Sequence, residues 1–307
     1  MSANAGAEIL APDSNLRAPK RPLPPGTVDC HAHIFDHFER YRFAGARKYS
    51  PPLCTREAWL ALHRSLGIER GVQVNASPYG FDNSITADFL EEHGGRFLGV
   101  AMLDPRISKA ELKRLDAAGF RAARLMDQYA TAATTADLES IAERIAPFGW
   151  HIEINIDKSE SWVGLEPRLR KCPVPLVFDH MGRVRGAEGV NAPGFTVIRR
   201  LLAERENCWT KISSFYRLSD SGPPHYEDMR SFAQTLLEER PDRCVWGSNW
   251  PHPGLTEFMP NDCDLLDLLE SWLPGDSVRD PLFAGNAARL YRFRRNTSRM
   301  WAASDLP

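Results

Sequence analysis

Two histidines separated by one residue give the sharpest chemical signal in this chain. His31 and His33 close an apolar segment that begins at Val28. Side chains on an extended strand alternate between its two faces, so both imidazoles would point to the same side. Such a pair can chelate a metal ion or hydrogen-bond a substrate. Two structural histidines at a strand end are the competing interpretation.

A third histidine, His180, follows another apolar segment. A catalytic zinc ion takes about three protein ligands and keeps one position open, and His31, His33 and His180 could supply the three. Other segment ends offer Asn155 and Asn249, whose neutral amides are poor metal ligands beside a carboxylate. We therefore expect no tightly bound metal cofactor. Weak or substoichiometric binding of a divalent ion such as Zn²⁺ by the three histidines is the alternative.

Three arginines lie at or just after the ends of such segments. Arg124, Arg183 and Arg217 hold this position in three different segments. A guanidinium binds a carboxylate in a bidentate manner and stays charged at every working pH. A single arginine is more often a surface residue paired with an acid. Three at equivalent positions favour an anionic substrate.

Further polar residues are expected to line the same pocket. Tyr49 lies in the long segment after His33 and could cover the pocket and donate a phenol hydrogen bond, although loop packing explains it equally well. Ser77 and His252 follow two other apolar segments. Ser77 has no G-x-S-x-G context, so a nucleophile elbow is not indicated.

The elements that must position these residues alternate along the chain. Eight short, β-rich apolar segments are each followed by a longer amphipathic stretch, and they cover residues 28–31, 72–75, 97–102, 121–125, 150–155, 176–180, 208–212 and 243–247. This alternation is typical of parallel βαβ units. Eight repeats, without a glycine-rich phosphate loop after the first, favour a closed (β/α)₈ TIM-like barrel over a doubly wound sheet. Active sites of such barrels lie at the C-terminal ends of the strands.

The chain is expected to be a single barrel domain with short extensions. Residues 1–25 are proline-rich, which predicts an extended N-terminal arm. We expect residues 26–295 to form the barrel and residues 296–307 to form a C-terminal tail.

Composition and charge limit the classes of function. The 38 Lys and Arg nearly balance the 40 Asp and Glu, giving a net charge of −2. A nucleic-acid binder would carry a basic excess. The sequence contains no run of 18 apolar residues, so no membrane span is expected. Six cysteines without a C-x-x-C pair, and no secretory signal, favour the cytoplasm.

Four motifs together resemble the amidohydrolase superfamily and, within it, a metal-independent lactonase branch. They are VDCHAH at 28–33, RKY at 47–49, FDHMGR at 178–183 and WGSNWPHP at 246–253. The resemblance covers the chain from about residue 26 to residue 292, and it implies the barrel fold. It also implies that the three histidines polarise a lactone carbonyl and that Tyr49, Ser77 and the three arginines hold the acid substrate.

The chain departs from the pattern of this branch at two strand ends. The resemblance implies an aspartate after the eighth strand that activates water, but Asn249 occupies that position. An amide cannot accept a proton at neutral pH, so it cannot be this base. Asn155 stands where a tyrosine is implied, and no second arginine follows Arg124 closely.

These observations predict a hydrolase that opens a lactone, or a related small cyclic acyl compound, bearing a carboxylate. The expected partner is a small anionic cyclic substrate from the catabolism of aromatic or sugar acids. A homodimer is compatible with this expectation. The alternative hypotheses are a metal-dependent decarboxylase, a lactone isomerase on the same scaffold and a non-catalytic acid-binding protein. Asn249 is the residue that favours the last of these.

Overall fold

Eight parallel strands form the centre of the molecule in a computed structural model that describes residues 7–45 and 47–293. They are β2 (Val28–Ala32), β4 (Arg70–Val74), β5 (Phe97–Ala101), β6 (Phe120–Met126), β7 (His151–Asn155), β8 (Leu176–Phe178), β9 (Cys208–Ile212) and β10 (Cys244–Trp246). Each strand pairs with the next in chain order. All eight predicted strand segments are present at these positions.

The sheet curls until its first and last strands meet. The backbone N–H of Asn249 donates to the carbonyl of His31 at 2.7 Å, and that of His33 donates to the carbonyl of Trp250 at 2.8 Å. A parallel bridge between Ala32 and Trp250 lies beside them. These contacts join β2 to the segment after β10. The predicted single-domain (β/α)₈ barrel is confirmed.

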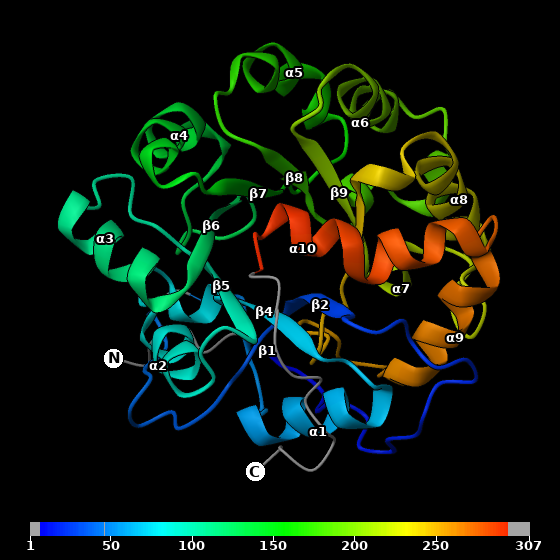
Figure 1. Cartoon of the computed structure of the whole chain (residues 1–307), viewed down its shortest axis with the longest axis horizontal. Helices are drawn as coiled ribbons and strands as arrows, with labels where there is room; N and C mark the ends of the chain where they lie inside the picture. Colours follow the sequence, from blue (N-terminus) through cyan, green and yellow to red (C-terminus); the bar gives the residue numbers. More distant parts are fainter. Residues whose placement is uncertain (1–6, 46, 294–307) are drawn as a thin grey trace.

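An outer ring of helices covers the strands (Figure 1). The ring contains α1 (Arg56–Leu66), α2 (Ser84–Glu92), α3 (Lys109–Ala118), α4 (Leu138–Ile145), α5 (Ser161–Lys171), α6 (Pro193–Glu204), α8 (Arg230–Glu239) and α9 (Asp262–Trp272). Local signals set several ends. The Thr55 and Ser108 hydroxyls cap α1 and α3, and Gly67 ends α1 in a left-handed conformation. Hydroxyl caps satisfy amide groups that have no partner inside the helix.

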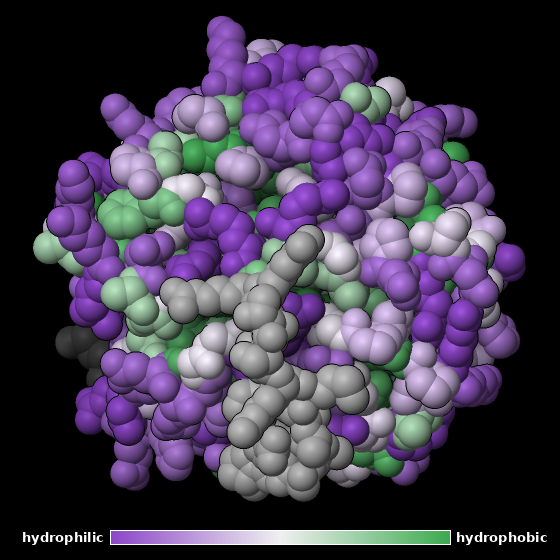
Figure 2. Space-filling model, in the orientation of Figure 1, coloured by the Kyte–Doolittle hydropathy of each residue, from purple (hydrophilic) through white to green (hydrophobic). Residues whose placement is uncertain are grey.

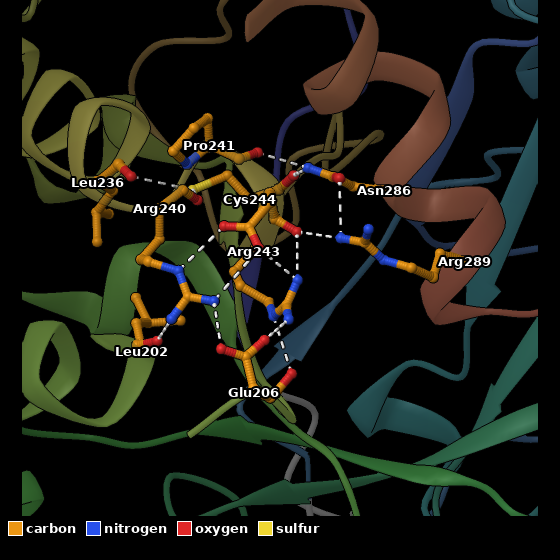
Figure 3. A network of polar contacts seen from close by, with 10 residues as sticks. Leu202, Glu206, Leu236, Arg240, Pro241, Arg243, Cys244, Asn286 and Arg289 are labelled. Atoms are coloured by element: carbon orange, nitrogen blue, oxygen red, sulfur yellow. Dashed lines mark hydrogen bonds and ion pairs between the residues drawn. The ribbon is translucent and has the colours of Figure 1, made fainter. Parts of the chain in front are cut away.

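The C-terminal helix α10 (Asn286–Leu290) closes the N-terminal end of the barrel and crosses its middle in Figure 1. Asn286 Nδ2 donates to the carbonyls of Pro241 and Cys244, both at 2.7 Å, and these residues lie at the start of β10. An arginine-rich cluster surrounds this junction (Figure 3), in which Arg243 Nε donates to the carbonyl of Glu206 at 2.9 Å. Ligands must therefore approach from the opposite, C-terminal end.

The N-terminal arm runs along the outside of the barrel. Its strand β1 (Ala7–Glu8) pairs with β3 (Tyr49–Ser50), and Arg17 forms an ion pair with Asp267 of α9 at 2.9 Å. The predicted C-terminal tail lies outside the described residues. All six cysteines are buried and free.

Hydrophilic side chains cover most of the face shown in Figure 2, and apolar ones are scattered among them. Within the described ranges, no helix is long and apolar enough to span a membrane.

Candidate active site

The side chains predicted to do chemistry all lie at the C-terminal end of the barrel. They lie in the last residues of seven of the eight strands or in the segments that follow them, and they are His31, His33, Tyr49, Ser77, Arg124, Asn155, His180, Arg183, Arg217, Asn249 and His252. Parallel strands bring their carboxyl ends to one edge, which is why positions so distant in the sequence share one region.

The three histidines form a tight, buried cluster. The His31 ring centre is 5.0 Å from that of His33 and 4.8 Å from that of His180. Burial lowers the pKa of all three, to about 3 for His33, and the positive charge of Arg124 acts in the same direction. The cluster is therefore uncharged at neutral pH.

The hydrogen-bond partners of His31 and His33 fix opposite tautomers. His31 Nδ1 lies 3.0 Å from the Lys211 ammonium, which can only donate, so the His31 proton must sit on Nε2. His33 Nδ1 lies 2.7 Å from the carbonyl oxygen of Val74, which can only accept, so its proton sits on Nδ1. His31 thus presents a hydrogen-bond donor, and His33 presents a lone pair.

Beneath the histidines lies a fully buried ionic network that the sequence analysis missed. Lys211 Nζ is 2.5 Å from Glu153 Oε2 and 3.3 Å from Asp179 Oδ1. Arg124 Nε donates to Asp179 Oδ2 at 2.9 Å. Burial opposes ionisation of Asp179, yet Lys211 and Arg124 lower its pKa below the usual range. Charged residues inside otherwise apolar strands, Glu153 in β7 and Lys211 in β9, were the available signal.

This network gives Arg124 a structural role. Its Nε and Nη2 atoms contact Asp179, the latter at 2.8 Å. A guanidinium has five N–H donors, so both hydrogens of Nη1 and one of Nη2 do not point to Asp179. Arg124 therefore holds Asp179 in place, and its role in binding a substrate carboxylate stays a prediction.

The donor atoms do not suit a divalent metal ion, although Asp179 supplies the carboxylate that the sequence argument found lacking. His31, Asp179 and His180 place ligand atoms within 4.8 Å of one another. The ammonium of Lys211, however, takes the lone pair of His31 Nδ1 and lies 3.3 Å from Asp179 Oδ1. His31 Nε2 carries a proton and has no lone pair to give. A metal here would lie beside two fixed cations, Lys211 and Arg124.

Two arginines at the barrel mouth lack acidic partners. Arg183 and Arg217 are half-buried, and neither forms an ion pair with any carboxylate in the described part of the chain. Burial, together with the charge of Arg217, lowers the pKa of Arg183 to about 10. Arg217 Nη1 donates to the carbonyl of Pro253. Among the described residues Asp157 acts on Arg183 only from a distance, so these two neighbouring cations form a site suited to an anion.

The segment that carries His180 and Arg183 has an unusual backbone. His180, Met181, Gly182 and Arg183 all have φ between 53° and 72°. Side chains disfavour this left-handed region by about 1–2 kcal/mol per residue. Strain of this kind is typical of functional sites, where surrounding contacts hold it. Here the indole N–H of Trp162 donates to the carbonyl of Gly182 at 2.7 Å.

The remaining predicted residues line the rim or lie behind it. Tyr49 is buried, and burial raises its pKa, while a hydrogen bond from Ser77 acts in the opposite direction. Asn155 Oδ1 accepts from Gln128 Nε2 at 2.8 Å. His252 is completely buried, and its Nδ1 lies 2.7 Å from Tyr216 Oη, so its predicted contact with a substrate stays a prediction.

Comparison with known proteins agrees with this architecture. Residues 28–293 match the amidohydrolase family model, so the chain belongs to the amidohydrolase family. It is 36% identical to 2-pyrone-4,6-dicarboxylate hydrolase of Comamonas testosteroni, over 91% of this chain and 94% of that protein.

Two further relatives support the same placement. The chain is 32% identical to 4-sulfomuconolactone hydrolase of Hydrogenophaga intermedia, over 92% of this chain and 94% of that protein. A crystal structure of an Agrobacterium tumefaciens protein in its apo form superposes with a TM-score of 0.80 at 27% identity, covering 90% of this chain and 99% of that one. The chain is an enzyme of this family.

Proposed function

We propose that this enzyme hydrolyses a lactone that carries an acidic group. One observation supports this proposal most strongly. Arg183 and Arg217, which form no ion pair with a described carboxylate, lie at the barrel mouth, and the histidine cluster below them is buried and uncharged. The arginines supply the counter-charge for an anion, and the histidines supply a neutral polar pocket for an ester. Two relatives with more than 30% identity are hydrolases of acidic lactones by name.

In this proposal His31 polarises the lactone carbonyl. Its Nε2–H is buried and has no hydrogen-bond partner among the described residues. The charge of Lys211 behind the ring strengthens this donor, because a low-dielectric site enhances electrostatic interactions. A donor aimed at a developing oxyanion contributes about 2.7–4 kcal/mol in enzymes where it has been removed.

In this proposal His33 does not polarise the lactone carbonyl, which is the role that the resemblance implies for it. Its Nε2 is an acceptor in the tautomer that Val74 enforces, so it cannot stabilise an oxyanion. It can instead orient a hydroxyl or a water by accepting a hydrogen bond. With a pKa of about 3, His33 is too weak a base to hold the proton of the attacking water at neutral pH.

The reaction is proposed to proceed without a metal ion. The support is the chemistry of the donor set: Lys211 engages the lone pair of His31 and also lies beside Asp179. A family member that binds zinc at this position would need a free lone pair on each imidazole.

A screen of matched lactones tests the function. Each lactone acid is presented beside its uncharged methyl ester, and ring opening is followed with a pH indicator. We expect turnover of at least one acidic lactone and at least 10-fold lower kcat/KM for its ester. If no lactone is opened, or if esters are preferred throughout, the proposed function is wrong.

A further inference from the structure

A chain of polar side chains leads from Asn249 away from the histidine cluster. Asn249 Nδ2 lies 2.8 Å from Tyr216 Oη, and Tyr216 Oη lies 2.7 Å from His252 Nδ1. His252 Nε2 lies 3.2 Å from Asp262 Oδ1. Tyr216 comes from the short helix α7 (Phe215–Leu218), His252 from the segment after β10, and Asp262 from the first turn of α9.

Hydrogen-bonding capacity fixes the direction of this chain. The amide nitrogen of Asn249 can only donate, so the phenol oxygen of Tyr216 accepts from it. At the other end, the Asp262 carboxylate can only accept, so the neutral imidazole of His252 carries its proton on Nε2, facing Asp262. Its Nδ1 then has a lone pair, which accepts the proton of Tyr216. This is the order of groups in a hydroxyl–imidazole–carboxylate triad, with a phenol as the hydroxyl.

The position of Asp262 is costly unless His252 can become charged. Its carboxylate is buried, and in the described part of the chain neither of its oxygens has an aligned hydrogen bond. The 3.2 Å approach to His252 Nε2 is close but oblique. A buried carboxylate without aligned partners is unfavourable. An imidazolium at His252 would convert the contact into a full ion pair, and such bonds commonly tighten during the reaction.

The phenol end of the chain is connected to the histidine cluster through Asn249. Tyr216 is half-buried, whereas Asn249, His252 and Asp262 are buried behind it. Asn249 also donates its backbone N–H to the carbonyl of His31 at 2.7 Å, which ties the chain to the proposed carbonyl donor. Tyr216 is therefore the most exposed member of the chain, and the proposal places the attacking water at its phenol oxygen.

We infer that Tyr216, acting with His252 and Asp262, transfers the proton of the attacking water and replaces the carboxylate base that Asn249 cannot be. This inference rests on the proposed lactone hydrolysis. In this proposal Tyr216 is the catalytic residue, because it would accept the proton of the water. His252 and Asp262 act through it as positioning residues, and Asn249 orients the phenol oxygen.

The proton transfers balance. Water oxygen bonds to the carbonyl carbon while one water proton passes to Tyr216 Oη and the phenol proton passes to His252 Nδ1. Asp262 stabilises the resulting imidazolium. When the ring C–O bond breaks, His252 returns its proton through Tyr216 to the leaving oxygen. The net change is addition of water across the ester bond, with the side chains restored.

The surroundings of Tyr216 favour concerted transfer. Burial raises the pKa of Tyr216 to about 12, against the opposing charge of Arg217. Arg217 on α7 and Asp262 on α9 are the charged groups that face it, and Asn249 and Ser214 are its neutral neighbours. The phenol therefore stays protonated at neutral pH and can lose its proton only as it gains another.

Tyr216→Phe tests the inference on the best acidic lactone found. General-base catalysis contributes about 10²–10⁴-fold, so we expect kcat to fall at least 100-fold with little change in KM. Tyr226→Phe is the matched control, since Tyr226 is buried against the same Phe215 but lies outside the chain. Its kcat should stay within 3-fold of the parent.

A rescue distinguishes proton transfer from packing. Adding Asn249→Asp to Tyr216→Phe supplies a carboxylate with no phenol beside it, and we expect kcat to recover at least 10-fold. The inference is overturned if Tyr216→Phe stays within 3-fold of the parent, if Tyr226→Phe falls equally, or if the carboxylate restores nothing.

A measurement without substrate separates this inference from the proposed function. Nitrogen-15 NMR of histidine-labelled protein should show His252 protonated on Nε2, with an Nδ1 shift that moves in Tyr216→Phe. A proton on Nδ1 would overturn the inference. Should the parent open no lactone, the proposed function fails, and the tautomer still decides whether the chain is arranged for proton transfer.

Discussion

At the scale of single residues, the site depends on which partner each imidazole has. His31 and His33 are separated by one residue and share a face. Lys211 nevertheless makes Nε2 of His31 a donor, and the carbonyl of Val74 makes Nε2 of His33 an acceptor. The spacing of the two histidines predicted their proximity correctly. It could not predict their tautomers, because the partners come from β9 and β4, which are far away in the sequence.

Removing one unpaired arginine should weaken binding of the acidic substrate. Arg183→Met should raise KM at least 30-fold, equivalent to about 2 kcal/mol, the lower end of the range for a desolvated charge pair. Arg185→Met is the matched control, because the exposed Arg185 already pairs with Asp220. Steady-state kinetics on acid and ester substrates checks the result. An equal KM for the parent and Arg183→Met would place the anion elsewhere.

Lys211 should be needed for folding as well as for activity. Lys211→Met leaves Glu153 and Asp179 buried without their shared cation, and we expect a loss of about 3–5 kcal/mol in the free energy of unfolding. Adding Glu153→Gln removes one of the stranded charges and should recover part of that loss. Urea unfolding of the parent and both variants measures the difference. If Glu153→Gln lowers the free energy of unfolding of Lys211→Met further, the network described here is wrong.

At the scale of elements, the left-handed turn after β8 shapes the active site. Gly182 lies in this turn with φ of 72°, and a Cβ there would stand 1.7 Å from Ile198 Cδ1 of α6. The close approach of α6, and not conformation alone, requires glycine at this position.

Gly182→Ala and Gly189→Ala separate these two effects. Gly189 has φ of 73° and open space around it, so its alanine variant should lose only about 1 kcal/mol of stability. Gly182→Ala should lose about 1–3 kcal/mol more, because overpacking adds to the conformational cost. Thermal or urea unfolding gives both values. Equal losses would show that α6 does not constrain the turn.

The sequence predicted the strands well because each one is a short, mostly apolar segment followed by a longer amphipathic stretch. It did not reveal the left-handed turn at residues 180–183, since three of these residues are not glycine. It also did not reveal α10, whose role depends on contacts with the start of β10. Both features arise from tertiary packing, which local patterns do not encode.

At the scale of the whole molecule, buried neutral histidines should make folding sensitive to acid. Burial lowers the pKa of five of them: His31, His33, His63, His151 and His180. Below about pH 6.5 the unfolded chain binds protons at these positions and the folded chain does not. The free energy of unfolding should therefore fall as the pH falls from 6.5, by up to about 1.4 kcal/mol per pH unit for each histidine.

His151→Gln tests this dependence away from the proposed site. Because burial lowers the pKa of His151, the variant should flatten the slope just below pH 6.5 by up to about 1.4 kcal/mol per pH unit. His225→Gln, on the exposed segment after α7, is the matched control. Urea unfolding at several pH values measures both. A slope that His151→Gln leaves unchanged would mean that His151 is already protonated in the folded protein.

If this barrel opens an acidic lactone with its own side chains, the reaction needs no metal ion. The most direct measurement is turnover of the best acidic lactone by enzyme treated with a chelator, with residual metal counted by mass spectrometry. We predict full activity with far less than one equivalent of any divalent metal, because Lys211 and Arg124 already occupy the positions around His31 and Asp179. Activity that disappears with the metal and returns when one equivalent of zinc is added would show that the enzyme depends on a metal.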